Sequence, residues 1–404
     1  LIASARRNSP ADVASLLETL RSLQLGKLDF DAVTESVQAQ LADLDQQPIS
    51  TQKPLQEATL LQELVYNYEQ AQQWQEAIAG QEQLATLYRQ IPSLNNRLPK
   101  LQWSIGQNQE AAGDLEAATR TYRYAYQLAQ SLTQFATAQE VLLSLGNLYR
   151  QEQGYEQAIQ TYQILLQVNR NSRDAYGLLD AYDRLGEMYL AVADIPSAED
   201  SFSRALNLAR QLQYIGQETR QLEHLAALYT DLEQWDFALA MRNQLAEIYP
   251  QTRVCRNTAK CEKLAEAKLA IAELETELSF PLEEIQQTYL EAYQFATRDE
   301  QRDLRNKALL AIAQGYEALE QTDGAILAYR LLIENNNRLV NTFRFEDVFA
   351  TELFEAYRRL AAIYNQVDNR EEAKELLEAA LTTAKFIESD QVAGLRADLR
   401  ALKN

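Results

Sequence analysis

The sequence contains few of the residues that turns and sheets require. Only 12 glycines and 8 prolines occur among its 404 residues. An all-β fold needs many turn residues, and an α/β fold needs glycine where strands meet helices, so this scarcity argues against both classes. The good helix formers Leu, Ala, Gln, Glu and Arg dominate instead. We therefore expect an all-helical protein.

The residues of catalytic and metal sites are equally scarce. Histidine occurs once, as His224. There is no glycine-rich phosphate loop, no His-Glu-x-x-His pattern and no Cys-x-x-Cys pattern, and the many carboxylates do not follow a calcium-loop pattern. A lone histidine without a nucleophile motif is more often structural than catalytic. We expect no enzymatic activity, no cofactor and no metal site.

Basic residues and long apolar runs are also in short supply. The chain carries 38 basic and 58 acidic side chains, a net charge of −20, which repels nucleic acid and anionic membrane surfaces. No apolar run reaches the roughly 18 residues that a membrane-spanning helix needs. The excess of acidic side chains either keeps a large surface soluble or forms a face that binds a basic partner. Because the chain begins at Leu1 rather than Met, we expect its natural start, with or without a signal peptide, to lie upstream.

The feature that is abundant is internal repetition, mostly at an interval of 40 residues. A small residue recurs with apolar residues before it and a tyrosine usually three positions after it. These small residues are Gly106, Gly146, Gly186, Ala226, Ala313 and Ala361. An alanine follows each of them by twelve positions, at Ala118, Ala158, Ala198, Ala238, Ala325 and Ala373. Apolar spacings of three and four predict two helices in each copy.

This pattern resembles the tetratricopeptide repeat (TPR), a helix–turn–helix unit, in a variant with a 40-residue period rather than the commoner 34. The resemblance covers residues 58–385 and implies an all-α fold: a right-handed superhelical solenoid of about eight TPR repeats with helical caps. It also implies that the first helix of each pair lines a concave groove. The small residue and the alanine would let the two helices of a pair approach closely.

The two ends of the chain read as caps on this array. We assign residues 1–50 to an N-terminal helical hairpin or cap and residues 386–404 to a C-terminal capping helix. Pro48 and Pro54 bracket the linker after the hairpin. The insertion Asn341–Phe354 carries four phenylalanines, which either pack on the next repeat or form an exposed aromatic patch.

The register of the resemblance predicts which side chains face the groove and contact a partner. They are Tyr66, Trp103, Gln107, Asn147, Arg150, Asp183, Arg184, Glu187, Arg220 and Glu223. The Lys and Asn pattern with which related chaperone adaptors clamp a carboxylate is absent from these positions. Trp103 either anchors a partner segment or packs on the N-terminal cap.

The two cysteines, Cys255 and Cys261, lie close together between two repeats. This proximity favours a disulfide, which implies export to an oxidising compartment such as a periplasm or thylakoid lumen. The alternative is a pair of free thiols in a cytoplasmic protein. A zinc site is disfavoured because His224, the remaining soft ligand, is distant in sequence.

Three hypotheses for function follow. The first is a non-catalytic scaffold that binds a partner protein or peptide in the groove. The second is an exported assembly factor, since the composition is similar to that of TPR proteins assisting photosystem assembly, with an acidic surface that binds Mn²⁺ or Ca²⁺ weakly. The third is a TPR signalling regulator or phosphatase, disfavoured because no catalytic glutamine motif or long helical head is present. The sequence predicts neither the partner nor the oligomeric state.

Overall fold

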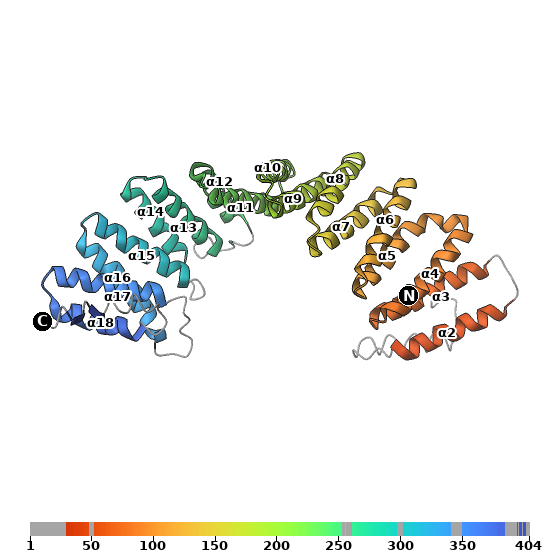
Figure 1. Cartoon of the computed structure of the whole chain (residues 1–404), viewed down its shortest axis with the longest axis horizontal. Helices are drawn as coiled ribbons and strands as arrows, with labels where there is room; N and C mark the ends of the chain where they lie inside the picture. Colours follow the sequence, from red (N-terminus) through yellow and green to blue (C-terminus); the bar gives the residue numbers. More distant parts are fainter. Residues whose placement is uncertain are drawn as a thin grey trace. The chain divides into compact units, whose positions relative to one another are not determined.

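The computed structural model describes residues 30–47, 52–252, 255, 261–296, 302–340, 350–383, 394, 396–397 and 399–400. Every regular element within these ranges is a helix (Figure 1). None of the helices in the described part of the chain is long and apolar enough to cross a membrane. The predicted all-helical class is confirmed.

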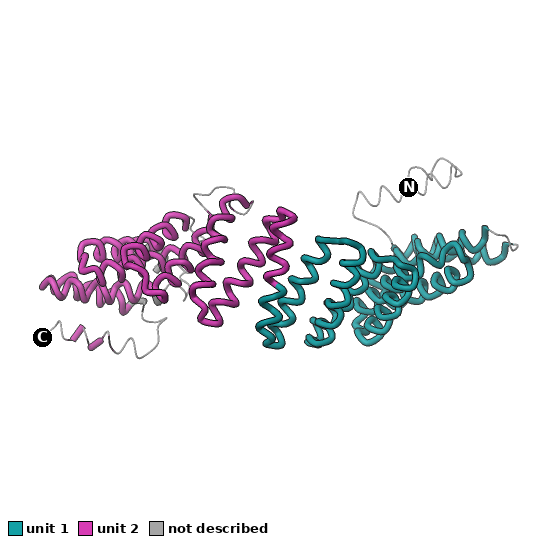
Figure 2. The backbone as a smooth tube through the Cα atoms, turned by 90° about the horizontal axis from the view of Figure 1, so that it is seen from above, with its two compact units in different colours: residues 1–201 teal, residues 202–404 magenta. Residues whose placement is uncertain are grey.

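The chain divides into two compact units, residues 1–201 and 202–404, which Figure 2 distinguishes by colour. The first unit contains α2 (Phe30–Gln46), α3 (Lys53–Gln70), α4 (Trp74–Gln90), η2 (Pro92–Arg97), α5 (Leu98–Ala111), α6 (Leu115–Ser131), α7 (Phe135–Gln151), α8 (Tyr155–Ser172) and α9 (Ala175–Ala191). The division falls within α10 (Ile195–Gln211).

The second unit continues the same succession of helices. It contains α11 (Ile215–Asp231), α12 (Trp235–Ile248), η3 (Tyr249–Gln251), α13 (Glu262–Glu277), α14 (Leu282–Phe295), α15 (Arg302–Ala318), α16 (Thr322–Val340), α17 (Ala350–Gln366) and α18 (Arg370–Thr383).

The helices form consecutive pairs. In the first unit α3 packs on α4, α5 on α6 and α7 on α8, and each pair also contacts the next one along the chain. The second helices α6, α8, α10 and α12 begin at Leu115, Tyr155, Ile195 and Trp235, which are 40 residues apart. The helix pairs therefore follow the repeat that the sequence contains.

A recurring turn separates the two helices of each pair. Gln153, Ala193 and Glu233 adopt positive φ angles of 60°, 58° and 56° at equivalent places, and Gly113 adopts 83°. In the α7/α8 turn the N–H of Gly154 donates to the carbonyl of Tyr149 at 2.8 Å. This bond satisfies one of the carbonyls that a helix leaves without a partner at its end.

The repeated small residue makes room for an aromatic ring rather than for the opposite backbone alone. A Cβ atom added at Gly106 would lie 2.5 Å from Cε1 of Tyr122, and one at Gly146 would meet the ring of Tyr162 in the same way. Both tyrosines come from the second helix of the same pair and are fully buried. The absent side chain thus lets a large ring cross the first helix.

The predictions for the ends meet the described residues only in part. Residues 1–29, 48–51, 341–349 and 384–393 lie outside them, so the first helix of the hairpin and most of the phenylalanine insertion are not placed. Phe354 is buried in the core of the second unit. Pro54, predicted in a linker, lies in the first turn of α3, where its missing N–H costs no hydrogen bond.

Candidate protein-interaction site

The predicted interaction residues of the first unit lie on its first helices α3, α5, α7 and α9. Successive first helices contact one another through side chains. The indole N–H of Trp103 on α5 donates to Oγ of Ser144 on α7 at 2.9 Å. Trp103 is half-buried against the core of this unit, so its ring bridges two repeats.

Asn147 on α7 is the next point of contact. Its Oδ1 accepts from Nη1 of Arg184 on α9 at 2.8 Å and from the hydroxyl of Tyr162 at 3.0 Å. Nε of Arg184 also donates to Asp180 at 2.8 Å, one helical turn earlier. Burial alone would lower the pKa of the Arg184 guanidinium, but the hydrogen bond and charge of Asp180 raise it above its usual value. Arg184 is therefore a fixed, charged group.

Arg150 and Glu187 form a weaker contact between the same two helices. Their charged atoms lie 3.8 Å apart, and the Arg150 side chain is 44 % exposed. Gln107 is exposed on α5, and Tyr66 on α3 is 58 % exposed. We call the residues Tyr66, Trp103, Gln107, Asn147, Arg150, Arg184 and Glu187 the first-helix face.

Asp183 lies one helical turn before Glu187 on α9, so the two side chains share one side of the helix. Unlike Glu187, Asp183 is almost entirely buried, with an exposed fraction of 3 %. Because neighbouring groups cover it in this structure, we do not include it in the first-helix face.

The two predicted residues of the second unit are engaged in local contacts. Nε of Arg220 lies 3.4 Å from Nε2 of His224. Glu223 accepts from the hydroxyl of Tyr249 at 2.6 Å and lies 3.9 Å from Nζ of Lys263. Burial, followed by the hydrogen bond to Glu223, raises the pKa of the Tyr249 hydroxyl.

His224 has a structural environment. Its ring stacks on Phe202, with centroids 4.7 Å apart and planes inclined by 11°. Phe202 occupies the place in its repeat that Tyr162 occupies in the α7/α8 pair. Phe202 of the second helix α10 therefore contacts the following first helix, α11.

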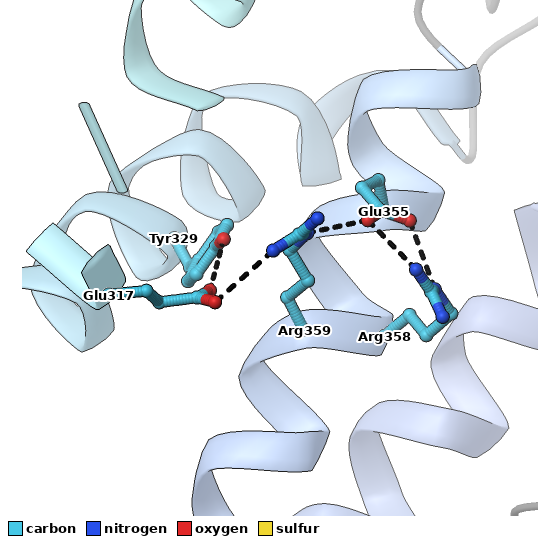
Figure 3. A network of polar contacts seen from close by, with 5 residues as sticks. All are labelled: Glu317, Tyr329, Glu355, Arg358 and Arg359. Atoms are coloured by element: carbon cyan, nitrogen blue, oxygen red, sulfur yellow. Dashed lines mark hydrogen bonds and ion pairs between the residues drawn. The ribbon is translucent and has the colours of Figure 1, made fainter. Parts of the chain in front are cut away.

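A network in the second unit matches that of Arg184 and was missed by sequence reasoning (Figure 3). Arg359 on α17 donates to Glu355 at 2.6 Å and to Glu317 on α15 at 3.2 Å. Glu317 also accepts from the hydroxyl of Tyr329. Arg359 stands two positions before Ala361, as Arg184 stands two before Gly186, so the small residues mark the place of this arginine in the repeat. Glu317 has no such signal, because it lies four positions after Ala313 whereas Asn147 lies one after Gly146.

Glu355, one of the two acidic residues of this network, is held ionised. Arg358 donates to both oxygens of Glu355, at 3.0 Å each, in addition to the bond from Arg359. Burial alone would raise the pKa of the Glu355 carboxyl, but the bonds and charges of Arg358 and Arg359 outweigh it, and the pKa lies below its usual value. A pocket of about 830 Å³ adjoins the network, with arginines and glutamates in its lining.

The sulfur atoms of Cys255 and Cys261 are bonded in the structure, with their Cα atoms 4.8 Å apart. Disulfides usually have Cα separations of 4.4–6.8 Å. Cys261 precedes α13, and its sulfur accepts from the N–H of Leu264 at 3.4 Å. The pair therefore holds the start of α13 to the chain segment that follows η3.

Comparison with known proteins agrees with the repeat. Residues 137–211, which span most of α7 to α10, match the family model of the tetratricopeptide repeat. The C-terminal part of a TPR repeat-containing protein from Cytophaga hutchinsonii is similar at a TM-score of 0.49, with 10 % identity over 72 % of this chain and 99 % of that one. No curated protein sequence matches the chain.

Two further solved structures are similar to it. A signal-transduction ATPase with a tetratricopeptide-repeat sensor from Pyrococcus horikoshii has a TM-score of 0.48 and 14 % identity, covering 87 % of this chain and 55 % of that one. BtubC from P. vanneervenii has a TM-score of 0.41 and 18 % identity, covering 57 % and 91 %. Residues 137–211 thus match the tetratricopeptide repeat, and the helix pairs directly before and after them follow the same 40-residue interval.

Proposed function

We propose that the chain is a scaffold that holds a segment of a partner protein or peptide against the first-helix face of its first unit and catalyses no reaction. The observation that carries this proposal is the series of contacts Trp103–Ser144, Asn147–Arg184 and Arg150–Glu187 between successive first helices. Proteins built from tetratricopeptide repeats generally bind other proteins or peptides.

The face combines fixed and accessible groups. Arg184 is held by Asp180 and Asn147, so it loses little conformational freedom when a partner binds. Tyr66, Gln107 and Arg150 remain exposed and offer an aromatic ring, an amide and a cation. Tyrosine and arginine are enriched among the residues that dominate binding energies.

The experiment compares two triple variants of matched composition. Tyr66→Ala, Gln107→Ala, Arg150→Ala removes exposed groups from the first-helix face. Tyr124→Ala, Gln127→Ala, Arg120→Ala removes the same residue types from the exposed side of α6, and Arg120 has an acidic neighbour, Glu116, as Arg150 has Glu187. Each protein is crosslinked in native extract, and its captured partners are identified by mass spectrometry.

We expect the first variant to lose a partner that the wild type and the α6 variant retain. Circular dichroism checks that both variants keep the helical content of the wild type. Recovery of the same partners by all three proteins would place binding elsewhere and contradict the proposal.

An exported assembly factor is the second candidate, because the cysteine pair is bonded in the structure. Disulfides persist in oxidising compartments and are rare in the cytosol. Protein isolated from its natural source in the presence of an alkylating agent should carry no label on Cys255 or Cys261 until it is reduced. Full labelling before reduction would favour a cytoplasmic protein instead.

A further inference from the structure

The second helices of the first unit carry a groove that is separate from the first-helix face. It lies between α6 and α8, is also lined by the beginning of α7, and has a volume of about 570 Å³. Volumes of 300–1,000 Å³ are typical of sites that enclose a ligand. We call it the α6/α8 groove.

The lining of this groove contains no charged residue. Thirteen residues line it, and all are apolar, hydroxyl-bearing or amide side chains. At the chain average of 24 % charged residues, about three of thirteen would be charged. Depletion of charge with retention of aromatic residues is the compositional mark of the central part of a protein interface.

The base of the groove is apolar and closely packed. Ala129, Ala138 and Val168 line it and are themselves almost entirely buried. Small side chains at the base leave space above them, and that space is open to solvent. An apolar group that enters it would be removed from water at a gain of about 25 cal/mol per Å² of buried surface.

Two large apolar side chains stand exposed at the rim. Phe135 at the start of α7 is 37 % exposed, and Ile164 on α8 is 42 % exposed. Single exposed apolar residues are common, but these two line the same concave surface. They would close over the sides of an apolar group seated on the base.

Amide groups form the walls and are partly oriented already. The amide of Gln163 donates to the hydroxyl of Tyr189 at 2.9 Å, and that of Gln167 donates to Asn171 at 3.2 Å. A primary amide is both donor and acceptor, so it matches the N–H and C=O groups of an extended backbone. Such walls favour a peptide over a purely hydrocarbon ligand.

We infer that the α6/α8 groove binds an uncharged, extended segment of a partner protein, with apolar side chains seated on its base. A charged segment would lose hydration there without gaining an opposite charge. A second copy of this chain is disfavoured as the occupant because two chains of net charge −20 repel each other. This inference does not depend on the first-helix face.

The test uses two short, fluorescently labelled synthetic peptides with blocked ends. In one, leucine alternates with serine and glutamine; in the other, glutamate replaces the leucines. Fluorescence anisotropy with the full chain should show binding of the neutral peptide and none of the acidic one. Ile164→Glu should raise the dissociation constant of the neutral peptide at least about tenfold, because the added carboxylate must be desolvated on binding.

Two control variants separate the groove from general effects. Ile164→Leu keeps the apolar rim and should retain binding, and Tyr124→Glu adds the same charge on α6 outside the lining and should also retain it. Because Ile164 is already half-exposed, Ile164→Glu should fold, which its melting temperature confirms.

Three results would overturn the inference. The neutral peptide fails to bind the wild type, the acidic peptide binds equally well, or Ile164→Glu binds the neutral peptide as the wild type does. Sedimentation equilibrium supplies a fourth: a wild-type dimer that Ile164→Glu dissociates would identify a second copy as the occupant. Binding on the first-helix face survives or fails independently, since none of these variants alters it.

Discussion

At the scale of single residues, the repeated glycine and the tyrosine of the paired helix act as one unit. Tyr122 is fully buried, and its hydroxyl donates to Glu110 at 2.8 Å. The ring is therefore held at both its edge and its hydroxyl and has little freedom to move. Gly106 has no side chain because this ring occupies the space.

Gly106→Ala should consequently destabilise the protein. A helix gains about 1 kcal/mol when alanine replaces glycine, but overpacking a core typically costs about 1–3 kcal/mol. Since an added Cβ would lie 2.5 Å from Tyr122, we expect a net loss of up to about 2 kcal/mol in the free energy of unfolding, measured by urea denaturation.

Gly216→Ala is the matched control, because the nearest atom to its added Cβ, in Tyr214, would lie at 3.7 Å. It should be neutral or stabilise the protein by up to about 1 kcal/mol. Equal effects of the two substitutions would show that the ring of Tyr122 is not the cause.

Glu355 gives a prediction for pH. Its pKa is below the ordinary value in the folded protein, so its ionised form contributes stability above the ordinary carboxyl pKa and loses it as pH falls through the lowered value. Glu355→Gln should lower the melting temperature clearly at neutral pH, and the gap to the wild type should narrow in acid. A gap that does not change with pH would contradict this.

At the scale of helices and turns, the left-handed residue between paired helices is the recurring feature. Non-glycine residues pay a steric cost of roughly 1–2 kcal/mol in this conformation. The α5/α6 turn avoids the cost with Gly113, whereas the α7/α8 turn uses Gln153. The repeat therefore tolerates strain at a position where glycine is the preferred residue.

Gln153→Gly should stabilise the protein. The relief of steric strain exceeds the added flexibility of the unfolded chain, and we expect a gain of about 0.5–1 kcal/mol. Gln127→Gly, at an exposed position inside α6, is the control and should cost about 1 kcal/mol. Urea denaturation measures both, and a loss of stability in Gln153→Gly would disprove the argument.

At the scale of the whole molecule, the excess of acid governs the electrostatics. With 58 acidic and 38 basic side chains, like-charge repulsion within the chain opposes the compact state. Salt screens exposed charges over about 10 Å at 0.1 M. Local pairs such as Arg359–Glu355 lie much closer than this, at 2.6 Å.

The melting temperature should therefore rise as sodium chloride increases from low to physiological ionic strength. The gain reflects screening of the long-range repulsion, while the close and partly buried pairs are screened less. Differential scanning calorimetry over a series of salt concentrations measures it. A steady fall would mean that ion pairs outweigh the net charge.

Sequence patterns predicted the helix pairs better than they predicted the groove-facing residues. Small residues at fixed intervals predicted the helix pairs from α5 to α12 closely, because each pair is a local packing problem solved by neighbouring residues. Groove-facing residues were harder to predict. Trp103, Asn147 and Arg184 do contact neighbouring repeats, but one residue of register separates partly buried Arg184 from almost fully buried Asp183.

The sequence by itself determined the helical class and the repeat, because periodic apolar residues and small residues act through neighbours in the chain. It also brought Cys255 and Cys261 close together. Only the tertiary structure decided the rest. The Glu317–Arg359 contact and the α6/α8 groove join residues of different helix pairs, and whether a glutamine faces a groove or a neighbour depends on how those pairs stack. Stacking is set by the sum of many side-chain contacts, which no single motif encodes.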